Sequence, residues 1–237
     1  ADSTDEPFRF YPYVRVSYPL MTDTLTLFGG IKGNLKPNSY HGLTSENPFL
    51  GGNANLRNTN RQFDIFAGAK GHWGEEFKYL TRFSYRNVEN MALYINDQRQ
   101  QRQFRVVYDS AITTVFQVHT ELDYQPVEQF EVGLALNFRN FNMGALAEPW
   151  HRPKLDYQLT GRYHFGDKIR LRAALHGFGQ REVLENGSAK TLNAILDINT
   201  GIDYRFSKTF TAFFNFRNLL GTQYQYWNQY PVRGFHV

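Results

Sequence analysis

Residues 155–180, LDYQLTGRYHFGDKIRLRAALHGFGQ, form two segments in which apolar and polar side chains alternate. Leu159 and its odd-numbered neighbours are apolar, whereas the even positions include Arg162. After a Gly-Asp-Lys turn at 166–168 the alternation resumes, with Leu171 on the apolar side. A period of two predicts a β-hairpin with one apolar and one polar face. The fold class depends on whether the apolar face meets a protein core or lipid.

Composition narrows the possible fold classes but does not select one. The 237 residues suit one large all-β domain or two ordinary domains, and no apolar run is long enough for a transmembrane helix. A mean hydropathy of −0.53 still suits a membrane barrel, whose alternating strands average to a polar composition. The chain has no cysteine, and its net charge of +4 is spread without a basic stripe, so no nucleic-acid partner is expected. Residues 1–6 lack signal-peptide features, which leaves export open.

The same alternation recurs along the chain and predicts ten antiparallel strands in one domain, 1–237, with no linker and no plug domain. The expected strands are 10–18, 25–35, 63–73, 77–85, 104–124, 130–138, 155–165, 169–179, 192–206 and 210–216, with 228–237 as the start of an eleventh. Short turns near 22, 75, 126, 167 and 208 alternate with long loops at 36–61, 87–103, 140–154 and 180–191. This rhythm is typical of an up-and-down meander with tight turns at one end and large loops at the other.

The distribution of side-chain size along the apolar parity favours lipid as its surroundings. No position of this parity is charged, and large aromatic residues such as Trp73 and Phe165 lie beside the tight turns. Small or aliphatic residues such as Ala67 and Leu134 lie farther along the strands. The alternative, a soluble barrel or sandwich, needs its largest apolar side chains near the middle of the strands to fill a packed core. A membrane wall needs aromatic rings at headgroup level, and a charge at its midplane costs roughly 2–4 kcal/mol. We therefore predict a transmembrane β-barrel in the bacterial outer membrane, with the bilayer as its partner.

The segment FFNFRNLLGTQYQYWNQYPVRGF, residues 213–235, resembles the closing strands of TonB-dependent outer-membrane receptors. The matching positions are Asn218, Leu219, Leu220, Tyr224, Tyr230, Pro231 and Gly234. That family has a plug domain, an energy-coupling box and about 22 strands, and usually ends on Phe or Trp, whereas this sequence ends at Val237. The resemblance implies the C-terminal half of a larger barrel for solute uptake, completed by its other half or by further subunits. A self-contained barrel of ten or twelve strands is the alternative.

Two sets of side chains are candidates for binding. If Phe165 faces Ile169, Arg162 lies opposite Arg172 and His164 opposite Arg170. Like charges facing each other are destabilising unless an anion intervenes. This basic patch in the lumen therefore either steers an anionic solute or is neutralised by neighbouring carboxylates, for which the candidates are Asp197, Asp203, Glu131 and Asp156.

The second set lies in the long loops, where aromatic and basic residues gather. Its members are Trp150, His151, Arg152, Tyr224, Trp227 and Tyr230. Exposed rings of this kind suit stacking on a flat ligand. The alternative is that they mark the membrane interface or pack the loops together. The solute itself does not follow from the sequence.

Catalytic, metal and cofactor sites are not expected. The seven histidines show neither an H-E-x-x-H pattern nor metal-ligand spacing, and no glycine-rich phosphate loop follows a strand. The resulting hypothesis is an outer-membrane barrel of the receptor or porin kind. Two other functions remain open: a barrel subunit of a secretion or assembly complex that binds proteins, and a barrel enzyme that acts on lipid.

Overall fold

The computed structural model describes residues 9–22, 24–52, 54–100 and 102–237. The expectation about residues 1–6 and the predicted turn residue Asp23 fall outside these ranges. The chain is 64% strand and 3% helix, so the predicted all-β class is confirmed. Within the described ranges, the structure has no helix with the length and apolarity needed to cross a membrane.

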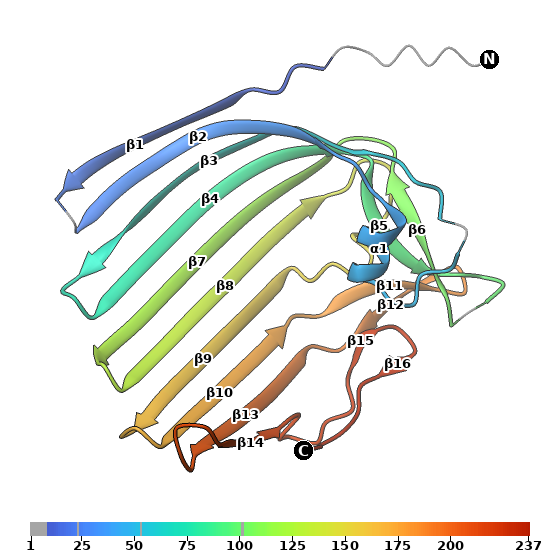
Figure 1. Cartoon of the computed structure of the whole chain (residues 1–237). Coiled ribbons are helices and arrows are strands. Elements are labelled where there is room, and N and C mark those ends of the chain that lie inside the picture. The colour runs from blue at the N-terminus through green and yellow to red at the C-terminus, as the bar shows by residue number, and fades with distance from the viewer. Residues whose placement is uncertain (1–8, 23, 53, 101) are drawn as a thin grey trace.

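A ten-stranded antiparallel sheet makes up most of the molecule (Figure 1). Its strands, in spatial order, are β1 (Tyr13–Met21), β2 (Leu25–Lys36), β3 (Thr59–Trp73), β4 (Phe77–Glu89), β7 (Thr113–Val127), β8 (Phe130–Asn142), β9 (Leu155–Phe165), β10 (Ile169–Phe178), β13 (Ile195–Arg205) and β14 (Thr211–Phe216). Neighbours in the sheet follow chain order apart from the elements inserted in the long loops, which confirms the up-and-down meander. The tight turns lie together at one end, where Gly74 and Gly166 adopt positive φ angles of 67° and 51° that favour glycine.

The long connections at the other end of the sheet are folded, which the sequence did not predict. They contain α1 (Tyr40–Glu46) and three hairpins: β5 (Met91–Asn96) with β6 (Phe104–Asp109), β11 (Arg181–Glu185) with β12 (Ser188–Leu192), and β15 (Gln225–Trp227) with β16 (Tyr230–Pro231). We call residues 40–54, 91–109, 143–153, 181–192 and 224–231 the loop cap, within the described ranges.

The predicted strand 104–124 is therefore wrong, because two strands share that segment. Asp109 ends β6, and its carboxylate accepts hydrogen bonds from the backbone N–H groups of Gly144 and Ala145 at 2.8 and 2.7 Å and from the Thr113 hydroxyl at 2.5 Å. These bonds fix Asp109 in the cap, so β6 pairs with β5, and β7 enters the main sheet four residues later.

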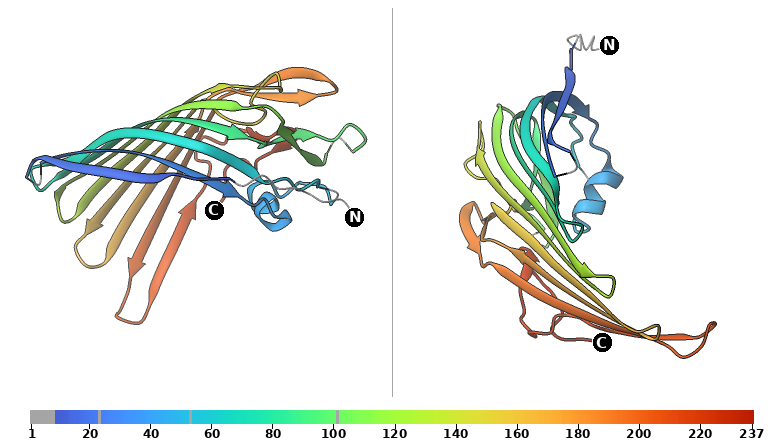
Figure 2. Two further views of the ribbon diagram at one scale, coloured as in Figure 1. Left: turned by 90° about the horizontal axis from the view of Figure 1, so that it is seen from above. Right: turned by 90° about the vertical axis from the view of Figure 1, so that its left-hand side faces the viewer.

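The sheet is the wall of a partial barrel, since its edge strands β1 and β14 each pair with one sheet strand within the described residues. The expected eleventh strand at 228–237 is wrong as a sheet strand. Within this described range only Tyr230 and Pro231 form a strand, β16, and a single antiparallel bridge joins His236 to Arg217 beyond the end of β14. Figure 2 shows that the sheet curves and that α1 lies on its concave side.

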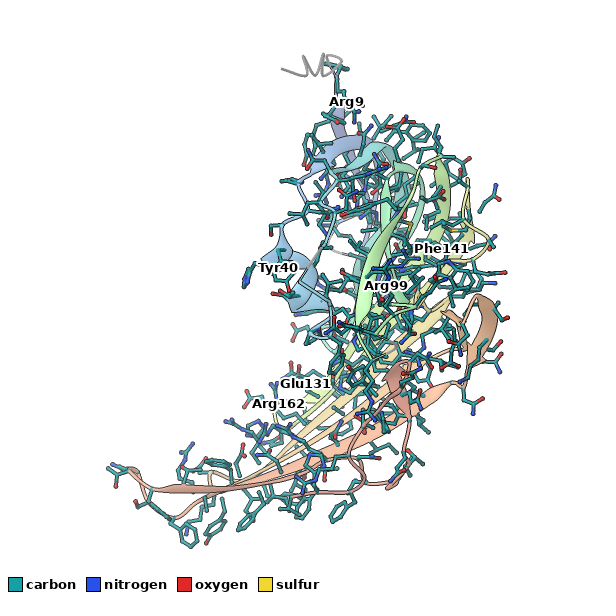
Figure 3. All side chains as sticks on the ribbon, turned by 90° about the vertical axis from the view of Figure 1, so that its right-hand side faces the viewer. Arg9, Tyr40, Arg99, Glu131, Phe141 and Arg162 are labelled. Atoms are coloured by element: carbon teal, nitrogen blue, oxygen red, sulfur yellow. The ribbon has the colours of Figure 1, made fainter. Side chains whose placement is uncertain are left out.

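The two faces of the sheet differ as the alternation predicts. Large apolar side chains of the apolar parity are exposed, among them Leu159 on β9, Leu196 on β13 and Trp73, 80% exposed, at the turn end of β3. Charged residues of the opposite parity lie on the concave side, as Glu131 and Arg162 do in Figure 3. The two buried apolar clusters of the described residues consist of loop-cap side chains. This arrangement fits a wall with lipid outside and water inside.

Candidate ligand-binding site

A cavity of about 420 Å³ lies between the concave face of the sheet and the loop cap. Its lining combines the loop-side ends of strands with residues of α1, β5 and the segment before β9. Lys36 is the last residue of β2, while Arg61, Arg86 and Arg139 lie near the loop-side ends of β3, β4 and β8. Lys36, Arg86 and Arg139 belong to the polar parity of their strands, which faces the concave side. A bulge between Arg61 and Phe63 brings Arg61 to the same side, opposite Val88.

A fifth cation, Arg152, comes from the loop cap, and the lining carries two carboxylates. Arg152 forms an ion pair with Glu46 at the end of α1 and donates from Nη2 to the Ala92 carbonyl at 3.1 Å. Arg139 forms an ion pair with Asp156. Both carboxylates of the lining are therefore engaged by arginines, and the cavity retains an excess of positive charge.

The cap side of the cavity is fixed by a buried tyrosine. Tyr94 on β5 donates its hydroxyl to the Leu43 carbonyl at 3.3 Å and to Glu46 at 3.2 Å. Burial, and then the neighbouring Glu46 carboxylate, raise the pKa of Tyr94 well above its ordinary value. The hydroxyl therefore stays protonated, and its bonds join β5 to α1 over the cavity.

Aromatic rings hold the loop cap together. The Trp227 ring meets those of Tyr94 and Phe104 edge-on, each with ring centres 5.3 Å apart, and the Phe104 ring meets the His151 ring at 5.1 Å. Edge-to-face pairs of this kind stabilise beyond the burial of their area. The cap is thus a packed unit with its own core.

His151 lies at the centre of this unit with 7% of its surface exposed. Its Nδ1 lies 2.9 Å from the Tyr94 carbonyl, and the Asn228 backbone N–H points to Nε2 at 3.4 Å. A carbonyl accepts and an amide N–H donates, so both contacts suit a neutral ring with its proton on Nδ1. Burial lowers the pKa of His151 to about 4, the bond to Tyr94 opposes that shift, and the charges of Arg181 and Arg152 add to it.

Arg181 connects two hairpins of the cap. It is 2% exposed, and its guanidinium donates to the carbonyls of Tyr226 and Gln225 at 2.8 and 2.9 Å. Nearby, Glu185 accepts from Gln229 at 2.8 Å and from Lys190 at 2.7 Å. Hydrogen bonds from Lys190 and Gln229 lower the pKa of Glu185 to about 2. The contacts of Arg181 and Glu185 join β11 to the β15–β16 hairpin, and Lys190 on β12 braces Glu185.

Some of the loop residues predicted to bind a ligand are buried and others are partly exposed, a difference that the sequence did not reveal. The expectation of exposed rings is wrong for Trp150, His151 and Trp227, which are 5–8% exposed because they pack inside the cap. Tyr230 stacks on Phe49 with ring centres 3.4 Å apart. These rings pack the loops together, which was the alternative interpretation.

The other two predicted loop residues have some exposed surface. Arg152 lines the cavity. Tyr224 is half-buried, and burial followed by the charge and hydrogen bond of Asp197 raises its pKa to about 12. Ligand binding by the six residues remains a prediction.

The predicted basic patch has the expected register. Phe165 pairs with Ile169, which sets Arg162 opposite Arg172 and His164 opposite Arg170. Glu131 contacts Arg162 at 2.9 Å, and Asp203 contacts Arg172 at 2.8 Å. Two of the four expected carboxylates thus offset the facing arginines. The patch lies toward the tight turns, beside cavities of about 280 and 240 Å³, and its binding of an anionic solute also remains a prediction.

Sequence reasoning missed the cations on the sheet side of the large cavity. Lys36, Arg61, Arg86 and Arg139 lie on four different strands, and their convergence depends on pairings between residues far apart in sequence. The only signal of this convergence in the sequence was the position of each cation along its strand. Each is a cation close to a predicted long loop, at the loop-side end of a strand. Among the described residues, no cluster of three or more His, Asp or Glu side chains has metal-binding geometry.

Comparison with known proteins places the fold. No protein-family model and no curated protein sequence matches the chain. Solved structures of TonB-dependent outer-membrane receptors do share its fold, as the resemblance implied. FpvA of Pseudomonas aeruginosa bound to heterologous pyoverdines is 14% identical with a TM-score of 0.70, over 96% of this chain and 32% of that one. The ferric-catecholate import receptor Fiu from E. coli K12 is 13% identical with a TM-score of 0.68, over 94% and 33%.

The copper transporter OprC is 10% identical with a TM-score of 0.68, over 95% of this chain and 38% of that one. The chain therefore spans about a third of the length of the receptors it matches. At these identities the likeness concerns the fold: an antiparallel wall of the kind that forms part of a receptor barrel.

Proposed function

We propose that this chain forms part of the barrel wall of an outer-membrane receptor that takes up a small solute. The main support is the combination of an apolar convex face with a folded cap over a charged cavity on the concave face. The membrane then surrounds the convex face, the lumen lies on the concave side, and the cap selects the solute. The neighbours named for copper, pyoverdine and ferric catecholates make metal complexes the first solutes to test.

Completion of the barrel is part of this proposal. The edge strands β1 and β14 leave backbone groups unpaired within the described residues. Such groups cost several kcal/mol each in hydrocarbon, so a membrane barrel closes. We infer that strands beyond this segment, from a longer chain or another subunit, pair with both edges.

The function is tested in cells that naturally make the protein. Disruption of its gene is expected to lower cellular iron or copper under limitation of that metal, and re-expression restores it. Membrane fractionation with the same cells is expected to recover the protein with the outer membrane. Unchanged metal content under both limitations would contradict uptake of these metals, and recovery in a soluble fraction would contradict the membrane wall.

A further inference from the structure

We propose that the cavity between the sheet and the loop cap binds a compact polyanion with a flat apolar body. This inference rests on the proposed receptor function and specifies the class of its solute. It begins from the charges of the lining. Glu46 and Asp156 are each engaged by an arginine, and no carboxylate of the lining pairs with Lys36, Arg61 or Arg86.

Unused hydrogen-bond donors point to the same solute. The Nε–H groups of Arg61, Arg86 and Arg152 are buried and have no hydrogen-bond partner among the described residues. A buried donor without an acceptor is costly. All three side chains line the cavity, so an anion there would offset the charge of guanidinium groups whose buried Nε–H the protein leaves unpaired.

The apolar part of the lining specifies the remainder of the solute. Val88, Met91 and Val115 line the cavity from β4, β5 and β7, and Phe141 and Tyr226 add aromatic rings. A volume of about 420 Å³ lies in the range of small-molecule sites, which combine apolar walls with a few polar groups. A fully hydrated inorganic ion would leave these walls unused, whereas carboxylates on a ring would use walls and cations together.

The loop cap makes the site rigid before binding. Arg152 is held by Glu46 and the Ala92 carbonyl, and Arg86 donates to the Gln117 side chain. Cations already held in place lose less side-chain freedom when an anion binds. This favours a solute whose anionic groups are themselves fixed on a rigid frame.

The test uses the purified protein in nonionic detergent and isothermal titration calorimetry. The probe is benzene-1,3,5-tricarboxylate, and the matched uncharged probe is benzene-1,3,5-tricarboxamide. The tricarboxylate is expected to bind at least ten-fold more tightly. Arg61→Gln and Arg86→Gln are each expected to weaken its binding at least ten-fold. Lys36→Gln, a change at an exposed strand end, is expected to weaken it several-fold without affecting the fold.

Two control variants locate the site. Arg99→Gln changes an exposed arginine in the β5–β6 turn, and Arg162→Gln changes the basic patch near the tight turns. Arg99→Gln is expected to leave the affinity within two-fold, and Arg162→Gln is expected to weaken it less than Arg61→Gln or Arg86→Gln does. Equal affinity for the two probes, no detectable binding, or loss of binding in Arg162→Gln but not in the cavity variants would overturn the proposal. Membrane fractionation tests the receptor function separately, so the two ideas fail in different experiments.

Discussion

Acidification is expected to loosen the loop cap through His151. The ordinary histidine pKa is 6.5, and burial lowers it to about 4 in the folded cap. His151 therefore binds a proton more tightly in the unfolded cap than in the folded cap. Its contribution to the stability of the folded cap is complete above pH 6.5 and is lost as the pH falls toward 4. A difference of about 2.5 pKa units corresponds to about 3 kcal/mol, of which about 2 kcal/mol is lost between pH 7.5 and pH 5.

Tryptophan fluorescence provides a local assay. The chain has three tryptophans, and Trp73→Phe leaves Trp150 and Trp227, both buried in the cap. The Trp227 ring lies 5.2 Å from the His151 ring. Urea titrations of this variant at pH 7.5 and pH 5 are expected to give a lower midpoint at pH 5, equivalent to about 2 kcal/mol in the free energy of cap unfolding. Glu185 titrates below this window, since its pKa falls from 4.5 to about 2.

The matched control is His151→Asn, because the backbone at this position has φ of 60° and asparagine tolerates that conformation. The control lacks the titrating ring and is expected to give nearly the same midpoint at both pH values. An equal acid shift in the control and in the histidine protein would refute the assignment to His151. An unchanged midpoint in the histidine protein would refute the burial argument itself.

Three further predictions test the cap, the packing of the sheet and its lipid face. Arg181→Met leaves the carbonyls of Tyr226 and Gln225 without their charged donor and is expected to lower the free energy of cap unfolding by about 2–3 kcal/mol. Lys190→Met, at an exposed ion pair, is expected to change it by less than about 1 kcal/mol in the same titration. Gly71→Ala would bring a Cβ within 1.8 Å of a neighbouring backbone oxygen and is expected to destabilise the sheet by about 1–3 kcal/mol. The Cβ of the control variant Gly161→Ala meets nothing within 4 Å, so equal midpoints of urea unfolding in detergent for the two variants would contradict the close strand approach. Leu134→Arg on the apolar parity is expected to make the free energy of folding into lipid vesicles less favourable by roughly 2–4 kcal/mol, whereas Ala135→Arg on the concave side is expected to fold nearly normally. Equal yields of folded protein from the two variants would argue against the lipid face.

The sheet could be predicted because its signals are local. Alternation, tight turns and the parity of charged residues all lie within single hairpins, and Phe165 opposite Ile169 fixed the register of its hairpin. The closing motif has a similarly local role. Asn218 is buried with φ of 50°, and its side-chain amide donates to the carbonyls of Thr222 and Arg233. The motif recognised in the sequence thus contains a side chain that joins the turn at 218–222 to the segment at Arg233.

The loop cap could not be predicted, because its signals are distant. The segment 104–124 alternates throughout, and the bonds of Asp109 to residues about 35 positions away help to divide it into β6 and β7. Trp150 and Trp227 have the sequence context of exposed loop rings, yet they are buried by partners on other loops. The cavity was missed for the same reason. Four of its five cations lie on strands that are distant in sequence and are brought together only by the pairing of the sheet.

The orientation of the wall is tested most directly by spin labels on neighbouring residues of one strand. The chain has no cysteine, so Leu159→Cys and Gln158→Cys each create a unique labelling site on β9. In lipid vesicles, the label at 159 is expected to collide mainly with oxygen, which concentrates in the bilayer. The label at 158 is expected to collide mainly with a water-soluble nickel chelate. Equal accessibility at both sites, or the reverse pattern, would contradict a convex face in lipid and a concave face in water.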